Sequence, residues 1–339
     1  MRPNVKLDHP RGETHRTIRL GARHGTRKSP RTGFVRLLYV AAVLFSVLPA
    51  KPARAAVEHK LSHGATPSLR ISPDGWGNTS LDELRIVLDA VAAELAPRFP
   101  GRELGTLRIV YGEGGPLAFY EKSADGDYVI RLSARHSRWH QFVYQFSHEL
   151  CHLYSNFDNK LAHHGEIGHS NQWFEESVCE AAALYTVRRL AIRWETDPPA
   201  PQFAGYGQTL QALADYLVSE PHRRLSASTT LADWFRSNRA DLEGSPYLRD
   251  KNEVVANRML PLFEQDSDAL GAIGYLNHRP EDAERPFDDY LRAWEDACPP
   301  AQRPLVAQII GLFEGREAAP QETPKPASPA GLMIAQSAR

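Results

Sequence analysis

Residues 145–154 read Gln-Phe-Ser-His-Glu-Leu-Cys-His-Leu-Tyr, and the helix that they predict is the element around which the fold has to be built. His148 and His152 are four residues apart, so a helix would carry both imidazoles on one face, one turn apart. Two imidazoles so placed can bind one metal ion, and Glu149 puts a carboxylate beside the same site. The sequence therefore predicts a metal site carried by a helix.

The residues around this motif favour a helix from Trp139 to Ser155. Its apolar side chains recur at helical spacing, namely Phe142, Val143, Phe146, Leu150 and Leu153. The pattern His-Glu-x-x-His is typical of zinc peptidases, in which the histidines are ligands and the glutamate is a general base. A catalytic zinc takes three protein ligands and one water, so we expect a third ligand nearby.

A second helix is predicted downstream, where residues 171–185 read Asn-Gln-Trp-Phe-Glu-Glu-Ser-Val-Cys-Glu-Ala-Ala-Ala-Leu-Tyr. Together the two segments resemble the gluzincin peptidases, the group that includes thermolysin and the zinc aminopeptidases. Their third ligand is a glutamate on a second helix, often three residues after a tryptophan, and Trp173 and Glu176 have that spacing. The resemblance covers residues 128–193, and Ser177 stands where the family usually has glycine.

The resemblance implies that one Zn²⁺ is bound by His148, His152 and Glu176, with Glu149 as general base. In thermolysin-like members an acidic residue four positions after the third ligand braces the first histidine, and Glu180 occupies that position.

Glu175 points about 100° away from its neighbour Glu176 on a helix, so both cannot face one zinc ion. We therefore expect Glu175 on a solvated face of the helix. Gluzincins often stabilise the oxyanion with a tyrosine or histidine of a helical subdomain, and Tyr206 and Tyr247 are the candidates here.

Two alternatives stay open around the site. Asp158, six residues after His152, is a second candidate for the third ligand, as in metzincin-like peptidases, although Ser155 replaces their glycine. If the two helices pack as in gluzincins, Cys151 and Cys179 come close and either form a disulfide or are small buried side chains.

The remaining segments predict an α+β fold with a zincin-like core. A helix from Ser80 to Arg98 follows an irregular lead-in at 57–79, and strands are expected at 107–111, 117–122 and 128–133. The strand at 128–133 is either the sheet edge that pairs with extended substrate or an interior strand. Further helices are predicted at 206–218, 230–242, 252–263, 286–297 and 305–314.

We divide the chain into a catalytic domain at 57–196, a helical C-terminal subdomain at 197–314 and a disordered tail at 315–339. Residues 1–56 are predicted to be an export signal. A basic segment precedes the 12 apolar residues 37–48, and the small-residue stretch Ala53–Ala56 follows. The protein would then be periplasmic or secreted, and it would touch the membrane only through an uncleaved signal.

The formal net charge of −1 argues against a nucleic-acid partner, because binding to phosphates needs a basic surface. We therefore predict a zinc peptidase that acts on a peptide or protein substrate. One alternative is an exported zinc-binding scaffold of the same fold that has lost turnover. Another is a helical protein in which the motif occurs by chance.

Overall fold

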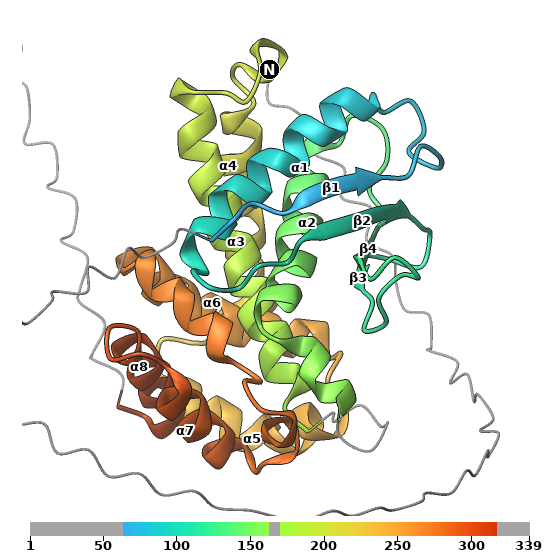
Figure 1. Ribbon diagram of the computed structural model, residues 1–339. Coiled ribbons are helices and arrows are strands. Elements are labelled where there is room, and N and C mark those ends of the chain that lie inside the picture. The colour runs from blue at the N-terminus through green and yellow to red at the C-terminus, as the bar shows by residue number, and fades with distance from the viewer. Residues whose placement is uncertain (1–63, 163–169, 317–339) are drawn as a thin grey trace, which may run out of the picture. The chain divides into compact units, whose positions relative to one another are not determined.

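A small mixed sheet and eight α-helices make up the part of the chain that the computed structural model describes, residues 64–162 and 170–316 (Figure 1). This arrangement confirms the predicted α+β class. The predicted export signal at 1–56 and residues 317–339 of the predicted tail lie outside the described residues. The predicted boundary at 196 stays a prediction.

None of the helices in the described ranges is both long and apolar enough to cross a membrane.

The sheet has the strand order β1-β2-β4-β3, with β1 at Ser68–Ile71, β2 at Thr106–Tyr111, β4 at Tyr128–Leu132 and β3 at Leu117–Ala118. The pairs β1–β2 and β2–β4 are parallel, whereas β3 runs antiparallel to β4. Buried and less buried residues alternate along β4, so one face of the sheet packs on the core.

The structure corrects two expectations about the sheet, the irregular lead-in and the length of the strand at 117–122, and it decides between the two positions left open for the strand at 128–133. The predicted lead-in at 57–79 contains strand β1, which buries only Leu69 and therefore gives no alternating pattern in the sequence. The strand predicted at 128–133 is interior, because β4 lies between β2 and β3, which leaves the two-residue β3 at the sheet edge. The strand predicted at 117–122 is shorter than expected, because β3 contains only Leu117 and Ala118. Pairing continues for one more residue, since the Phe119 N–H donates to the Val129 carbonyl at 3.0 Å.

Helix α1, Leu81–Leu95, connects β1 to β2 and packs against helix α2, Trp139–Tyr154. The Ser80 hydroxyl caps α1 as predicted, because it accepts a hydrogen bond from the Glu83 N–H at 3.4 Å. The fully buried side chains of α1 are those of Leu84, Val87, Leu88, Val91 and Ala92.

Helix α3, Gln172–Thr196, is the centre of the fold and packs against α2 and the later helices α4 and α6 (Figure 1). Most of its side chains are buried, and the small residues Ala181 and Ala183 let neighbouring helices approach closely. A helix this enclosed can hold carboxylates away from water, and Glu175 and Glu180 on α3 are both buried.

The five later α-helices lie where the sequence predicts them: α4 Gly207–Ser219, α5 Leu231–Gly244, α6 Arg249–Gln265, α7 Phe287–Ala297 and α8 Arg303–Glu314. Short 3₁₀ helices join the elements: η1 Ala96–Arg98, η2 Phe157–Ala162, η3 Pro201–Phe203, η4 Pro221–Arg223, η5 Asp268–Tyr275 and η6 Pro280–Glu284.

An aromatic cluster fastens the N-terminal end of α3 to these later helices. The Trp173 and Phe287 ring centroids are 4.8 Å apart, and Phe287 lies 5.2 Å from Phe235 and 5.0 Å from Phe313. Trp173 is fully buried, so the register of α3 next to Glu175 and Glu176 is fixed by packing.

Replacing Phe287 by alanine should lower the free energy of unfolding by about 3–5 kcal/mol, because a ring that is 1 % exposed leaves a cavity. Urea denaturation followed by circular dichroism measures the change. Tyr216→Ala is the matched control, since this ring is 45 % exposed and its loss should cost about 0.5 kcal/mol or less. Equal losses in the two variants would contradict this account of the cluster.

Candidate metal centre

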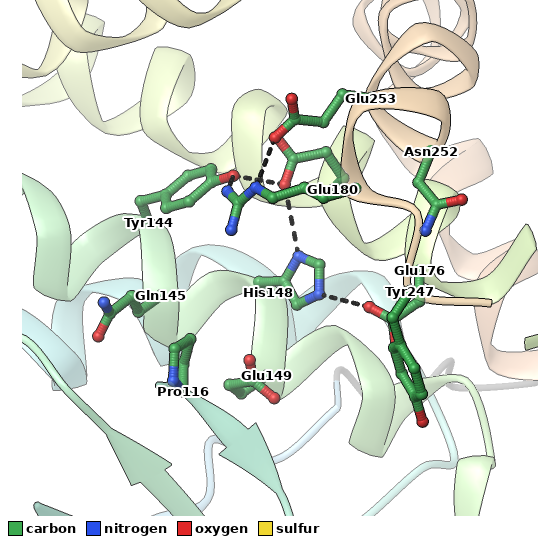
Figure 2. A pocket seen from close by; sticks show the side chains of 11 residues that line it. Pro116, Tyr144, Gln145, His148, Glu149, Glu176, Glu180, Tyr247, Asn252 and Glu253 are labelled. Atoms are coloured by element: carbon green, nitrogen blue, oxygen red, sulfur yellow. Dashed lines mark hydrogen bonds and ion pairs between the residues drawn. The ribbon is translucent and has the colours of Figure 1, made fainter. Parts of the chain in front are cut away.

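Helices α2 and α3 bring the three predicted ligands together. Oε2 of Glu176 lies 3.2 Å from Nε2 of His148 and 3.6 Å from Nε2 of His152. Among the described residues these three form a His/Glu group whose ligand atoms all lie within 4.8 Å of one another. Figure 2 shows Glu176 at one edge of the His148 ring, with Glu149 beside the same ring.

These spacings fit a zinc ion. Ligands about 2.0–2.1 Å from a tetrahedral ion are about 3.3 Å from one another, and the two measured separations of 3.2 and 3.6 Å bracket that value. Two imidazole nitrogens and one carboxylate oxygen are also a ligand set that catalytic zinc uses, with the fourth position left to water.

The charges around the site also favour a divalent cation. Glu175 pairs with Lys160, and Glu180 pairs with Arg223 at 2.8 Å. Within the described ranges, no lysine or arginine nitrogen lies within 4.0 Å of Glu149 or Glu176. No lysine or arginine therefore balances their two negative charges, and one Zn²⁺ would do so.

Without a metal, protons on the imidazoles supply that balance. Burial by itself would lower the pKa of His148, but its hydrogen bonds to Glu176 and Glu180 outweigh burial and raise the pKa to about 10. Burial likewise opposes protonation of His152, and the charges of Glu176 and Glu175 nonetheless hold its pKa well above the ordinary value. Because a metal ligand must be a neutral imidazole, zinc would displace these protons.

Glu149 is 4 % exposed and follows His148 on α2. Burial raises its pKa, while the two imidazoles and a hydrogen bond from the Ala118 backbone oppose that rise. Since Ala118 belongs to β3, the edge of the sheet helps to place this carboxylate. Glu149 also lines a pocket of about 250 Å³ together with His148 and Glu176.

Glu180 occupies the place that the sequence predicts for it, behind His148 (Figure 2). Its Oε2 lies 3.6 Å from Nδ1 of His148 and accepts a hydrogen bond from the Tyr144 hydroxyl at 2.5 Å. Arg223, which is 1 % exposed, donates to the other oxygen at 2.8 Å and outweighs the effect of burial, so the pKa of Glu180 is held well below its usual range. An ionised carboxylate behind Nδ1 leaves Nε2 free to bind metal.

Glu175 corrects the prediction of a solvated side chain, because it is fully buried. Its Oε1 lies 2.6 Å from Nδ1 of His152, and its Oε2 pairs with Lys160 and accepts from Asn277 at 2.7 Å. Helical rotation does keep Glu175 off the face that Glu176 occupies, but it does not place Glu175 in solvent, because the two nitrogens of one imidazole lie on different edges of the ring. Adjacent glutamates on α3 can therefore reach one ring from two sides, with Glu176 at Nε2.

Gln172 is a further residue that the sequence did not single out. Its side-chain N–H donates to Oε1 of Glu176 at 2.9 Å, one helical turn away. Its carbonyl oxygen accepts from the buried Lys160 and from the Tyr120 hydroxyl, so the amide orientation is fixed. This hydrogen bond holds one oxygen of Glu176 and leaves Oε2 to face the histidines.

Asp158 does not belong to the group. One of its oxygens accepts from Arg102 at 3.1 Å and the other from the Tyr128 hydroxyl at 2.6 Å, so both are occupied in an ion-pair network away from the histidines. The structure therefore favours Glu176 over Asp158.

The two predicted tyrosines have different positions. The Tyr206 hydroxyl lies 3.0 Å from Nδ1 of His140, eight residues before His148 and thus about 12 Å away along α2. This distance corrects its predicted role, because the hydroxyl cannot reach the ligands. Tyr247 lines the pocket beside Glu176 (Figure 2), and burial together with the charges of Glu176 and Glu175 raises its pKa to about 12.

The cysteines and a second polar group complete the description of the site. Cys151, Cys179 and Cys298 are free and buried, so the disulfide alternative is not realised.

Glu220, His222 and Glu253 form another cluster with ligand-like spacing. However, Arg223 and Arg249 both contact Glu253 at 2.7 Å, so these cations already balance its charge.

Comparisons of the chain with protein-family models, with curated proteins and with solved structures found no match. The function therefore has to be argued from the chemistry of the site.

The purified protein should bind one zinc ion per chain, and Glu176→Gln should lose this stoichiometric binding because it removes the only anionic ligand. Asp158→Asn is the matched control and should retain the ion. Metal content after dialysis, read by mass spectrometry, decides between them. Zinc retained in Glu176→Gln but lost in Asp158→Asn would overturn the ligand set.

Glu175→Gln should weaken zinc binding by about 10–100-fold, because it removes the charge that orients His152 without removing a ligand. Competition with a chromophoric chelator measures the affinity. Glu264→Gln, at an exposed ion pair with Arg188, is the control and should leave the affinity unchanged. Identical affinities in Glu175→Gln and wild type would contradict the role given to Glu175.

Proposed function

We propose that this protein is a zinc-dependent peptidase with a gluzincin-type, zincin-like core, exported to the periplasm or secreted. The observation that carries the proposal is the meeting of two imidazoles, one carboxylate ligand and the buried Glu149 in one pocket. The proposed compartment rests on the export signal predicted at residues 1–56.

Zn²⁺, when bound by His148, His152 and Glu176, would polarise the scissile carbonyl and lower the pKa of a water molecule. Glu149 is the base that takes a proton from the attacking water and passes it to the leaving amine. The products are a carboxylic acid and an amine, so the proton that leaves the water ends on nitrogen. The raised pKa of Glu149 suits both steps, because it makes the carboxylate a better acceptor for the proton of the water.

Tyr247 is the candidate donor for the oxyanion that develops on the carbonyl oxygen. Because its pKa is raised to about 12, its hydroxyl stays protonated at neutral pH and can donate a hydrogen bond. Its ring is 54 % exposed and lines the same pocket as Glu149, which keeps it within reach of a substrate.

Strand β3 is the candidate docking edge for an extended substrate. It is an edge strand of the sheet, Pro116 just before it lines the pocket, and the Ala118 backbone within it acts on the pKa of Glu149. A peptide that adds to this edge by main-chain hydrogen bonds would lie along the base. This assignment replaces the earlier candidate, the strand at 128–133.

Glu149→Gln should lower peptide hydrolysis by about 10²–10⁴-fold, because the amide cannot accept the proton, while the zinc content stays at one ion per chain. A fluorogenic peptide library together with metal analysis tests both parts. Glu121→Gln, an exposed carboxylate outside the pocket, is the control and should hydrolyse peptides at the wild-type rate.

The same experiment separates the enzyme from an inactive zinc-binding scaffold. A scaffold predicts zinc-loaded wild-type protein that cleaves no peptide of the library. Hydrolysis that is equal in wild type and Glu149→Gln would remove Glu149 from the mechanism.

A further inference from the structure

The wall of the pocket contains one arginine that the proposed chemistry does not use. Arg249 is the first residue of α6, and within the described ranges it is the only lysine or arginine that lines the pocket shared by His148, Glu149 and Glu176. The other charged or titratable groups nearby are the proposed ligands and base, which are carboxylates or histidines that must be neutral to bind metal. The positive charge of Arg249 has no role among them in the proposed hydrolysis.

Two hydrogen bonds hold the Arg249 guanidinium in place, while the side chain remains exposed to solvent. Its Nε donates to Glu253 at 2.7 Å, and its Nη2 donates to the Tyr144 hydroxyl at 2.9 Å. A guanidinium has five N–H donors, and the other three have no acceptor within hydrogen-bonding distance in the described part of the chain. The side chain is 59 % exposed. A guanidinium anchored on one side and free on the other is prepared to bind an anion in two-point geometry.

The neighbouring Arg223 cannot do the same. It is 1 % exposed, and Glu180 and Glu253 bind its Nη atoms at 2.8 and 2.7 Å. Glu253 is therefore shared between Arg223 and Arg249, and it leaves the charge of Arg249 only partly compensated.

The distance from Arg249 to the metal ligands suits a short piece of substrate. Its Nη2 reaches Nδ1 of His148 through the Tyr144 hydroxyl and Oε2 of Glu180. These three contacts are 2.9, 2.5 and 3.6 Å long, so at most about 9 Å separates the two nitrogens. An extended peptide advances about 3.3–3.6 Å per residue. A group bound to Arg249 therefore lies within about two or three residues of a carbonyl at the metal site.

We propose that Arg249 selects peptides that carry a carboxylate within three residues of the scissile bond, supplied either by an acidic side chain or by the free C-terminus. This inference rests on the proposed peptidase function. It adds the substrate class, and it makes Arg249 a specificity-determining residue that contacts the substrate.

The test uses the zinc-loaded full chain and matched peptides that differ only in one charge. One pair has glutamate or glutamine at the residues flanking the cleaved bond, and the other pair ends in a free acid or an amide. Wild type should prefer the charged member of a pair in kcat/KM by about 10–100-fold, the range for one charged hydrogen bond. The pair that shows the preference identifies the source of the carboxylate.

Arg249→Gln should remove the preference by slowing the charged peptide alone, and Arg249→Lys should restore part of it. A purely structural role for Arg249, through Tyr144 and Glu253, would slow the charged and neutral peptides equally and would overturn the proposal. Arg236→Gln, at an exposed ion pair with Asp233, is the control and should keep the wild-type ratio.

Equilibrium binding keeps the two proposals separable. The same peptide pairs are titrated into zinc-loaded Glu149→Gln protein with and without Arg249→Gln. A charge preference in binding that depends on Arg249 supports the inference even if no peptide is cleaved, in which case only the peptidase proposal fails. Equal binding of charged and neutral peptides rejects the inference, whatever the activity.

Discussion

The crossing of α2 over α3 is the contact on which the rest of the structure depends. It sets Nε2 of His148 and Nε2 of His152 within 3.6 Å of a single carboxylate oxygen of Glu176. Neither helix could hold this geometry alone, because each supplies only part of the ligand set. The aromatic cluster at the start of α3 and the sheet against α2 keep the two helices in register.

A buried charge is costly unless it has a partner, and the fold supplies one for each of the two glutamates that stand behind the imidazoles. Lys160 compensates Glu175, and Arg223 compensates Glu180. Each of these carboxylates stands behind one of the two imidazoles, so their partners also fix which ring nitrogen would face the proposed metal. Lys160 belongs to η2, which directly follows α2, whereas Arg223 belongs to η4, far from the motif in sequence. Removing one partner of such a buried pair typically costs about 3–5 kcal/mol.

The elements and residues with a regular local pattern could be predicted from the sequence. Both site helices and the shared face of His148 and His152 follow from spacing along a helix, whereas Glu176 and Glu180 were expected from the resemblance to gluzincins. Glu175 could not be placed in this way, because its partners belong to other segments and only tertiary packing brings them together. Gln172 bonds to Glu176 on the same helix, but Lys160 and Tyr120, which fix its amide, belong to other segments. The adjacent glutamates Glu175 and Glu176 indicated that both could lie near the site. Helical rotation alone cannot show that they approach one imidazole from two sides. Strand β1 was missed because its four residues bury only one side chain, which gives no alternation of apolar and polar residues in the sequence. Tyr206 was proposed on residue type, which contains no information about distance.

The central claim is that one zinc ion joins α2 to α3. Anomalous diffraction on both sides of the zinc absorption edge, from crystals of the full chain grown with one equivalent of zinc, tests this claim most directly. The account predicts one strong peak per chain, about 2.0–2.2 Å from Nε2 of both histidines of the motif and from Oε2 of Glu176. A peak bound instead by Glu220, His222 and Glu253, or the absence of a peak bonded to His148 and His152, would contradict it.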